Sequence, residues 1–195
     1  MDELIAIFRF DLFEFGLAAV TLAAVVLIGV EQGIAVAVGL AIIDRIRLSA
    51  RPQLHVLGRI ADTTSWAPLA NPAASQVPGV LVVLFATPLW YANAMHFRDE
   101  VSEALAQAPR GVRVLVLDTI GMSDLDFTGA RALDRVLQTC ARDHITLALA
   151  RTGDHARRSL QRSGLAARIG PEHLYASVDE AVVALAPDAP PASPA

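Results

Sequence analysis

The residues whose types and spacing best suit chemistry stand just after a short apolar run. Residues 112–117 read VRVLVL, which predicts a buried strand. The chain then crosses turn-forming residues and reaches Asp126, Thr128 and Gly129, after which a helical pattern begins. A helix that starts here presents unpaired backbone N–H groups and the positive end of its dipole, and both favour negative charge. Together with Arg131, these three residues predict a binding site for an anion or for the phosphate of a nucleotide.

A simpler interpretation of the same residues is structural. The side chain of Asp126 or Thr128 could cap the helix, since Thr and Asp are common at helix starts and such a cap stabilises a helix by about 1 kcal/mol. Asp124 and Asp126 would also repel a phosphate at this position. Capping alone is the interpretation that we favour, and the sequence leaves both uses of Thr128 open.

The other polar residues predict no catalytic or metal centre. Asp118 and Asp124 could form an acid pair or ligate a metal at the end of the strand. No His or Cys stands at ligand spacing nearby, however, and Asp is common in turns, so we interpret both as turn residues. The chain also lacks a Walker loop, a G-x-G-x-x-G motif and a G-x-S-x-G motif. We therefore expect no metal, no cofactor and no enzymatic activity.

The composition limits the classes of partner. The formal net charge is −4, which leaves no basic footprint for nucleic acid, so no nucleic-acid partner is expected. The hydrophobic fraction of 54% and the mean hydropathy of +0.46 are high for a soluble domain.

The lone Cys140 excludes an internal disulfide, and its place on the apolar face of a helical pattern predicts an inert core residue.

Much of the apolar excess lies near the front of the chain. Residues 15–43 are almost wholly apolar apart from Glu31 and Gln32, and this run exceeds the roughly 20 residues that cross a bilayer as one helix. One interpretation is a single tilted span that buries Glu31. The other, which we favour, is two shorter helices at about 15–30 and 33–46, because it places the charge of Glu31 at an interface. A buried hairpin of a soluble protein is the third alternative.

Arginines follow this apolar segment at once, at positions 45, 47, 51 and 59, and no such cluster lies in the turn around Glu31. Positive residues next to membrane segments favour the cytoplasmic side. We therefore expect residues 1–50 to form a terminal membrane segment, with the following domain in the cytoplasm and the chain in the inner membrane.

Pro52 marks the expected start of a second domain at residues 51–186, and the Pro- and Ala-rich tail at 187–195 is expected to be disordered. Apolar strand patterns alternate with helical patterns in this domain, which predicts an α/β fold with a mostly parallel sheet covered by helices. The expected strands are 54–60, 65–69, 80–86, 112–117 and 145–150. The expected helices run from a cap at Asn93 to 108, onward from Gly129, from 155 to 163, and from a cap at Ser177 to 185.

Three blocks of this sequence resemble a known family. Asp126-Phe127-Thr128-Gly129, followed by Leu133, resembles the STAS-domain signature of Asp, any residue, Ser or Thr, and Gly. STAS domains are shared by sulfate-permease (SulP) anion transporters and by anti-sigma-factor antagonists. Residues 78–97, PGVLVVLFATPLWYANAMHF, are similar to the transporter branch, and residues 10–48 look like its last membrane segments. The resemblance extends over about residues 9–185.

This resemblance implies a transmembrane helical hairpin followed by a cytoplasmic STAS domain with a regulatory or interaction role. The transporter's substrate site would lie in earlier membrane helices, so this chain by itself is expected to be incomplete for transport. The implied partners are the membrane and a transporter membrane domain on the same or a separate chain. A second copy of the chain, a nucleotide and a regulatory protein are further candidate partners.

The resemblance leaves one alternative open. In antagonists, the residue before the signature Gly is phosphorylated, and here that residue is Thr128. The chain would then be a membrane-tethered STAS regulator switched at Thr128. Phe127 departs from the small polar residue of the antagonist branch, and soluble antagonists need no apolar front segment. The transporter interpretation is therefore the one that we favour.

Overall fold

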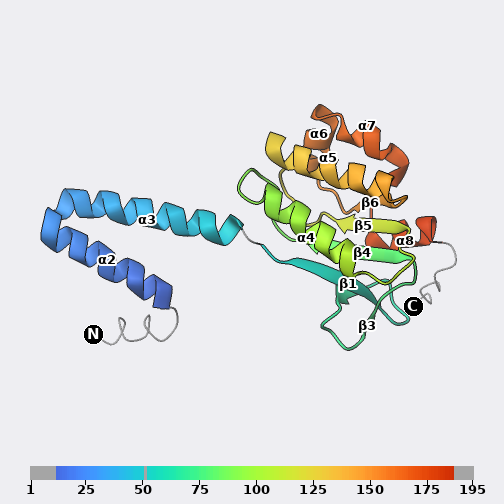
Figure 1. Ribbon diagram of the computed structural model, residues 1–195, viewed down its shortest axis with the longest axis horizontal. Coiled ribbons are helices and arrows are strands. Elements are labelled where there is room, and N and C mark those ends of the chain that lie inside the picture. The colour runs from blue at the N-terminus through green and yellow to red at the C-terminus, as the bar shows by residue number, and fades with distance from the viewer. Residues whose placement is uncertain (1–11, 51, 187–195) are drawn as a thin grey trace. The chain divides into compact units, whose positions relative to one another are not determined.

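The computed structural model describes residues 12–50 and 52–186 and divides the chain into two compact units, Met1–Ser49 and Ala50–Ala195 (Figure 1). The expected disordered tail at 187–195 lies outside the described residues, as does Arg51 of the arginine cluster.

The first unit holds two helices, α2 (Leu12–Ile28) and α3 (Val30–Ala50), which form a V-shaped pair in Figure 1. The break between them falls at Gly29, whose φ of +110° is a backbone conformation that residues with a side chain rarely adopt. Gly33 permits close packing beside this break, because a Cβ there would stand 2.3 Å from Cγ2 of Val25. The pair is thus two helices, both longer than the sequence predicted, and the exposed Glu31 lies in the first turn of α3.

Among the side chains that the structure describes, both helices carry large apolar ones that are exposed. The exposed ones are Val20, Leu22, Val26, Leu27, Ile28, Val30, Ile34, Val38, Ile42, Ile43 and Ile46. Within residues 12–50 and 52–186, no helix combines the length and the apolar character that crossing a membrane requires.

The described part of the second unit is built on a seven-stranded sheet in the order β2-β1-β4-β5-β6-β7, with β3 paired to β1. Strands β4 to β7 run parallel, whereas β1 is antiparallel to β2, β3 and β4. The sheet is therefore mixed rather than mostly parallel, because β1 joins the parallel strands antiparallel to β4. The short connection from β1 to β2 then allows only a further antiparallel hairpin. The strands are β1 (Leu54–Ile60), β2 (Trp66–Pro68), β3 (Ala74–Ser75), β4 (Val80–Phe85), β5 (Val114–Asp118), β6 (Thr146–Ala150) and β7 (Leu174–Tyr175).

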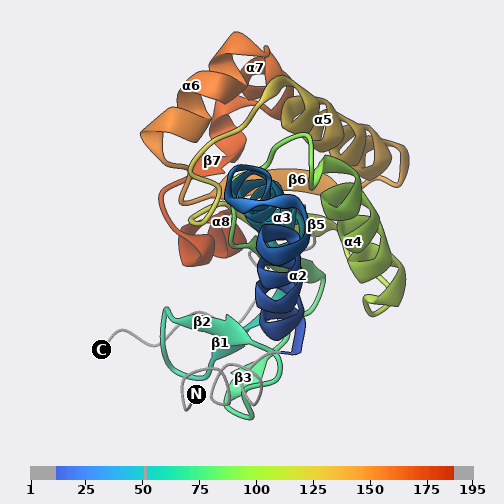
Figure 2. The ribbon, with the colours of Figure 1, turned by 90° about the vertical axis from the view of Figure 1, so that its left-hand side faces the viewer.

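Helices cover both faces of this sheet (Figure 2). One face packs against α4 (Ala94–Gln107), α5 (Phe127–Arg142), α6 (Asp154–Arg162) and α7 (Leu165–Ile169), and the other against α8 (Val178–Leu185). Each face of the sheet has its own hydrophobic core, and alternate residues of β4 pack into the two cores. Leu81 and Val83 face α4 and α5, and Val80 and Val82 face α8. The short helix η1 (Pro171–His173) precedes β7. The sequence patterns missed α7, η1, β3 and β7, which are too short for periodicity to reveal.

Cys140 confirms the prediction of a core residue. Its side chain is fully buried on α5, and burial, together with the negative charge of Asp143, raises the pKa of the thiol to about 11. The Ser177 cap is also confirmed, because its hydroxyl accepts a hydrogen bond from the backbone N–H of Glu180 at 3.1 Å. Both features were local enough to read from the sequence.

Candidate functional site

Asp126, and not Thr128, caps α5. The backbone of Asp126 is extended, and its Oδ1 accepts a hydrogen bond from the N–H of Gly129 at 2.7 Å. Thr128 is the second residue of the helix, and its side chain is exposed. The favoured interpretation of this motif as a helix cap therefore holds for Asp126. Its carboxylate also supplies negative charge at the positive end of the helix dipole.

The same carboxylate joins two loops that are distant in sequence. Oδ2 of Asp126 accepts from the backbone N–H of Tyr91 at 2.9 Å, in the loop between β4 and α4. The N–H of Leu89 donates to the carbonyl of Asp124 at 3.0 Å, and the N–H of Asp126 donates to the carbonyl of Leu89 at 3.2 Å. The two blocks of sequence that resemble one family are thus held together directly in space.

Gly129 is required at this junction by packing. A Cβ on Gly129 would stand 2.4 Å from the carbonyl oxygen of Leu89, which is too close for any side chain. Asn93 stands at the N-cap position of α4, as the sequence predicted, but its side chain bonds within the preceding loop instead of capping the helix. Its buried amide accepts from the N–H of Trp90 and donates to the carbonyl of Pro88, both at 2.9 Å, and it makes no capping bond to α4.

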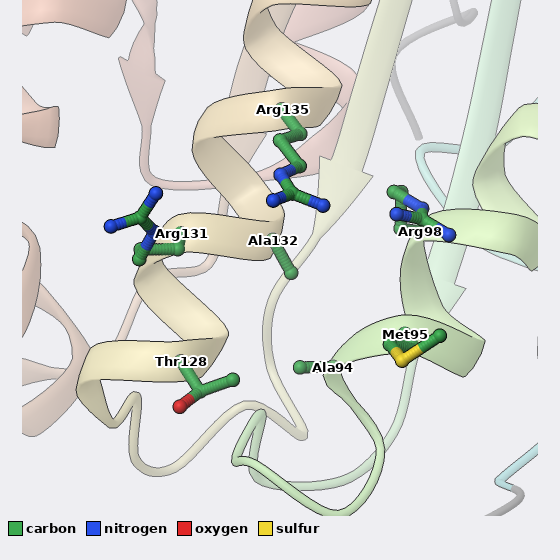
Figure 3. Close-up of a pocket in the computed structure, with 7 residues that line it drawn as sticks. All are labelled: Ala94, Met95, Arg98, Thr128, Arg131, Ala132 and Arg135. Atoms are coloured by element: carbon green, nitrogen blue, oxygen red, sulfur yellow. The ribbon is translucent and has the colours of Figure 1, made fainter.

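A cleft of about 230 Å³ lies between α4 and α5 beside this junction (Figure 3). Its lining consists of Ala94, Met95, Arg98, Thr128, Arg131, Ala132 and Arg135. Figure 3 shows the Arg135 side chain on the side of α5 that faces α4, where Arg98 lies, while the Arg131 guanidinium and the Thr128 hydroxyl point away from α4. Of the predicted site residues, Thr128 and Arg131 line this cleft, whereas Asp126 and Gly129 are occupied in the junction. The predicted phosphate site stays a prediction.

The sequence did not single out Arg98 and Arg135 as site residues. Arg131 and Arg135 are four residues apart on one helix and so share a face, and this could be predicted from the sequence alone. Arg98 belongs to another helix, and only the packing of α4 against α5 brings it near. Arg98 pairs with Asp99 at 2.7 Å, and the Arg131 guanidinium lies 5.9 Å from the ring centre of Phe127.

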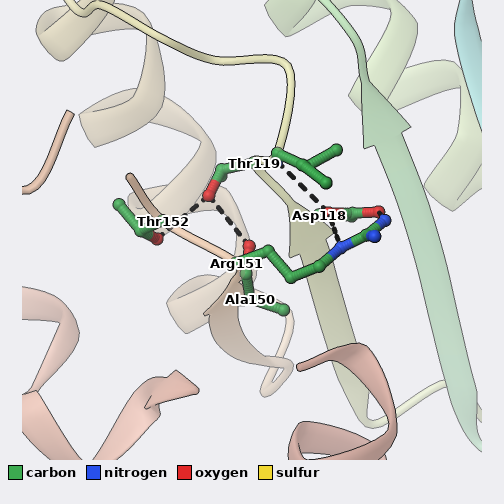
Figure 4. A network of polar contacts seen from close by, with 6 residues as sticks. Asp118, Thr119, Ala150, Arg151 and Thr152 are labelled. Carbon is green, nitrogen blue, oxygen red and sulfur yellow. Dashed lines mark hydrogen bonds and ion pairs between the residues drawn. The ribbon is translucent and has the colours of Figure 1, made fainter. Parts of the chain in front are cut away.

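Asp118 differs from the prediction of an exposed turn residue. It is completely buried at the end of β5, where its two oxygens accept from Nε of Arg151 at 2.9 Å and from a second guanidinium nitrogen (Figure 4). The hydrogen bond to Asp118 raises the pKa of Arg151. Arg151 also holds a left-handed backbone, with φ of +57°. A buried carboxylate needs such a partner, which makes Asp118 part of the core and not of a solvated turn.

A second set of bonds ties the same strand ends together. Oγ1 of Thr119 donates to the carbonyl of Ala150 at 2.9 Å and lies 2.9 Å from Oγ1 of Thr152 (Figure 4).

Asp124, in contrast to Asp118, is exposed and accepts from the N–H of Leu125 at 2.8 Å, as expected of a turn residue. In the part of the chain that the structure describes, no group of three His, Cys, Asp or Glu residues could hold a metal ion.

Comparisons with known proteins agree with the resemblance seen in the sequence. The STAS domain family model matches residues 71–181. A "Probable sulfate transporter" of Mycobacterium tuberculosis is 33% identical, with the match covering 94% of this chain and 33% of that protein. Sulfate transporter 1.3 of Arabidopsis thaliana is 27% identical over 96% of this chain and 30% of its own length. The chain thus spans about a third of the length of the curated relatives it matches.

Two solved structures have a similar fold. The structure titled "The overall structure of SLC26A9" superposes with a TM-score of 0.83 at 18% identity, covering 94% of this chain and 32% of that one. A structure of the murine Solute Carrier 26 family member A9 anion transporter in the inward-facing state also gives 0.83, at 21% identity over 92% of this chain and 29% of that one. At these identities the similarity establishes the fold alone.

Proposed function

Because this chain belongs to the STAS-domain family, we propose that it is the C-terminal part of a sulfate-permease-type anion transporter. In this proposal the Ala50–Ala195 unit is the cytoplasmic regulatory domain, and α2 and α3 are the last membrane helices. The main support for this proposal is the extent of the match to sulfate transporters. It covers 94% of the chain and therefore includes the N-terminal helix pair as well as the STAS domain.

The surface of the helix pair supports a place in the membrane. Among the described side chains of α2 and α3, eleven large apolar ones are exposed, and burying them in lipid or against further membrane helices would be strongly favourable. The hairpin places Glu31 at its bend, where a charge can stay in contact with water. The arginines that follow the apolar segment favour the inner membrane with the second unit on the cytoplasmic side.

We propose a regulatory role without catalysis, and a chain that cannot transport by itself. The two acidic groups best placed for chemistry are used structurally: Asp118 pairs with Arg151, and Asp126 binds two backbone N–H groups. The chain spans about a third of its curated relatives, so a substrate path would need the remaining membrane helices. A transporter membrane domain, on the same or a separate chain, is the partner that this role requires.

A membrane-tethered regulator of the antagonist type is the second candidate. The observation in its favour is the exposure of Thr128 at the start of α5, beside Arg131. A phosphate on Thr128 would stand close to the Asp126 carboxylate, which opposes it. Homodimerisation and nucleotide binding are further proposals that the same exposed surfaces allow.

Membrane fractionation followed by reconstitution tests the proposal. The full chain should sediment with membranes and resist alkaline extraction, whereas a chain of residues 52–195 should stay in the soluble fraction. Anion uptake should appear only when the missing membrane helices of a related transporter are supplied on a second chain. A full chain that behaves as a soluble monomer without detergent would overturn the membrane assignment. Altered partner binding in Thr128→Asp, with uptake unchanged, would favour the second candidate.

A further inference from the structure

We propose that the cleft between α4 and α5 is a docking site for an acidic, amphipathic protein segment. One apolar side chain of that segment fills the cleft, and its carboxylates pair with the arginines at the rim. This inference rests on the interaction role proposed above and adds the surface and the chemistry of the partner.

Exposed apolar side chains gather around the first turns of α4 and α5. Tyr91, Met95 and Phe127 are 61%, 70% and 77% exposed. The bond from the Tyr91 N–H to Asp126 brings Tyr91 to the start of α5, and Met95 lines the cleft with Thr128. Single exposed apolar residues are ordinary, but a cluster of three beside a cleft marks an interaction site. The flexible side chain of Met95 suits an adaptable contact.

The cleft itself is shaped for a side chain. Ala94 and Ala132 supply small side chains to its lining, and Met95 stands at one side (Figure 3). Its volume of about 230 Å³ exceeds the roughly 150 Å³ of a cavity that accommodates benzene, so one leucine- or phenylalanine-sized side chain fits. Such a hollow between two packed helices is where an amphipathic helix inserts its apolar anchor residue.

The rim of the cleft determines the charge of the partner. Arg98, Arg131 and Arg135 all line it, with the Arg131 guanidinium at the outer edge of α5, on the side away from α4 (Figure 3). Only Arg98 has a carboxylate partner among the described ion pairs. Asp134, on the same helix, pairs with Arg168 instead. The rim therefore carries net positive charge. Guanidinium groups bind carboxylates in a bidentate manner, so acidic residues flanking the apolar anchor complete the match.

A free phosphate fits this cleft less well. The backbone N–H groups of Gly129 and Tyr91, which could hold an oxyanion at the helix start, already donate to Asp126. A lipid surface also fits less well, because a flat bilayer cannot fill a hollow between two helices. A protein segment can place an apolar side chain in the hollow and carboxylates beside the arginines of the rim, so it matches both features of the cleft.

Peptide binding to the full chain in nanodiscs of zwitterionic lipid tests the inference. The probe is a fluorescent helical peptide in which glutamates stand three and four residues from a central leucine, and anisotropy reports its binding. Arg131→Glu combined with Arg135→Glu should weaken binding by about tenfold or more, since rim charges become repulsive. Met95→Ser should also weaken it. The matched controls are Arg158→Glu on α6 and Val183→Ser on α8. Both residues are exposed and neither lines the cleft, so these variants should leave binding unchanged.

Three outcomes would overturn the inference. These are equal binding of a peptide with lysines in place of the glutamates, equal effects of the control variants, and displacement of the peptide by inorganic phosphate. Protection of residues 91–98 and 127–135 from hydrogen exchange by anionic lipid alone would assign the surface to the membrane instead. Uptake measurements with the missing membrane helices test the transporter proposal separately, so a failed peptide assay and a failed transporter role are distinguishable.

Discussion

At the residue scale, the pair of Asp118 and Arg151 shows how burial changes the role of an ordinary acidic residue. Asp118 is fully buried, whereas the side chain of Arg151 is 38% exposed. Removing either partner breaks the same ion pair, but removing Arg151 leaves a buried carboxylate, whereas removing Asp118 leaves a partly exposed guanidinium. The two single substitutions should therefore have unequal costs.

Arg151→Ala should destabilise the protein by about 3–5 kcal/mol, because it leaves the Asp118 carboxylate buried without its partner. Asp118→Asn should cost less, about 1–2 kcal/mol, because water can solvate the exposed edge of Arg151. Urea unfolding followed by tryptophan fluorescence measures both values. Equal costs for the two variants would contradict the assignment of Asp118 as the buried member of the pair.

Cys140 should be protected from thiol reagents in the folded protein. Burial raises its pKa to about 11, so at pH 8 only about one thiol in a thousand is ionised. The folded state favours the neutral thiol, so this contribution to stability is complete below pH 9 and is lost as pH rises through about 11. Iodoacetamide labelling followed by mass spectrometry should be slow at pH 8 and fast in urea. Rapid labelling without denaturant would show that α5 opens readily.

At the scale of elements, the start of α5 is anchored to the loop after β4. Asp126 caps the helix and holds Tyr91, while Gly129 allows the Leu89 carbonyl to approach the helix. The contacts explain why the two sequence blocks occur together in one chain. They join a strand-to-helix loop on β4 with the equivalent loop on β5.

Gly129→Ala should destabilise the protein, because the new Cβ would meet the Leu89 carbonyl at 2.4 Å. Overpacking of this kind costs about 1–3 kcal/mol, against which the better helix propensity of Ala returns at most about 1 kcal/mol. Thr128→Ala is the neighbouring control and should stay within about 0.5 kcal/mol, since Thr128 makes no cap. Thermal unfolding compares the two. A loss near 1 kcal/mol in Thr128→Ala would show that its hydroxyl supports the helix after all.

At the scale of the whole molecule, the chain consists of two units with different surfaces. The helix pair exposes its apolar side chains, whereas the second unit buries its apolar residues in two cores on opposite faces of one sheet. In the described chain, every residue of these cores comes from positions after Pro52. The second unit therefore contains the interactions that it needs to fold.

A chain of residues 52–195 should consequently fold without detergent and unfold in one cooperative transition, as small single domains do. Circular dichroism during heating and size-exclusion chromatography measure this. The full chain is the comparison, and it should need detergent or lipid because α2 and α3 expose their apolar side chains. Aggregation of the shorter chain, or a broad transition, would show that the helix pair contributes to the core.

The sequence by itself determined the features that depend on local pattern. Apolar runs predicted the strands that became β1, β4, β5 and β6, and the Asp126 motif predicted a capped helix. The polar residues at 31 and 32 predicted a break in the apolar segment, which the structure places nearby at Gly29. The STAS resemblance, now confirmed, needed only short motifs in a fixed order. Backbone propensity and hydrophobic burial act over a few residues, so these features can be read from the chain.

Only the tertiary structure decided which distant residues meet. The antiparallel placement of β1 beside β4 made the sheet mixed, and the order of β5 and β6 brought Arg151 to Asp118. The packing of α4 against α5 placed Arg98 across from Arg135 and made Gly129 indispensable. These contacts depend on sheet order and helix packing, which the whole core fixes at once. Residues more than thirty positions apart carry no local signal of being neighbours, so pairings of this kind appear only in three dimensions.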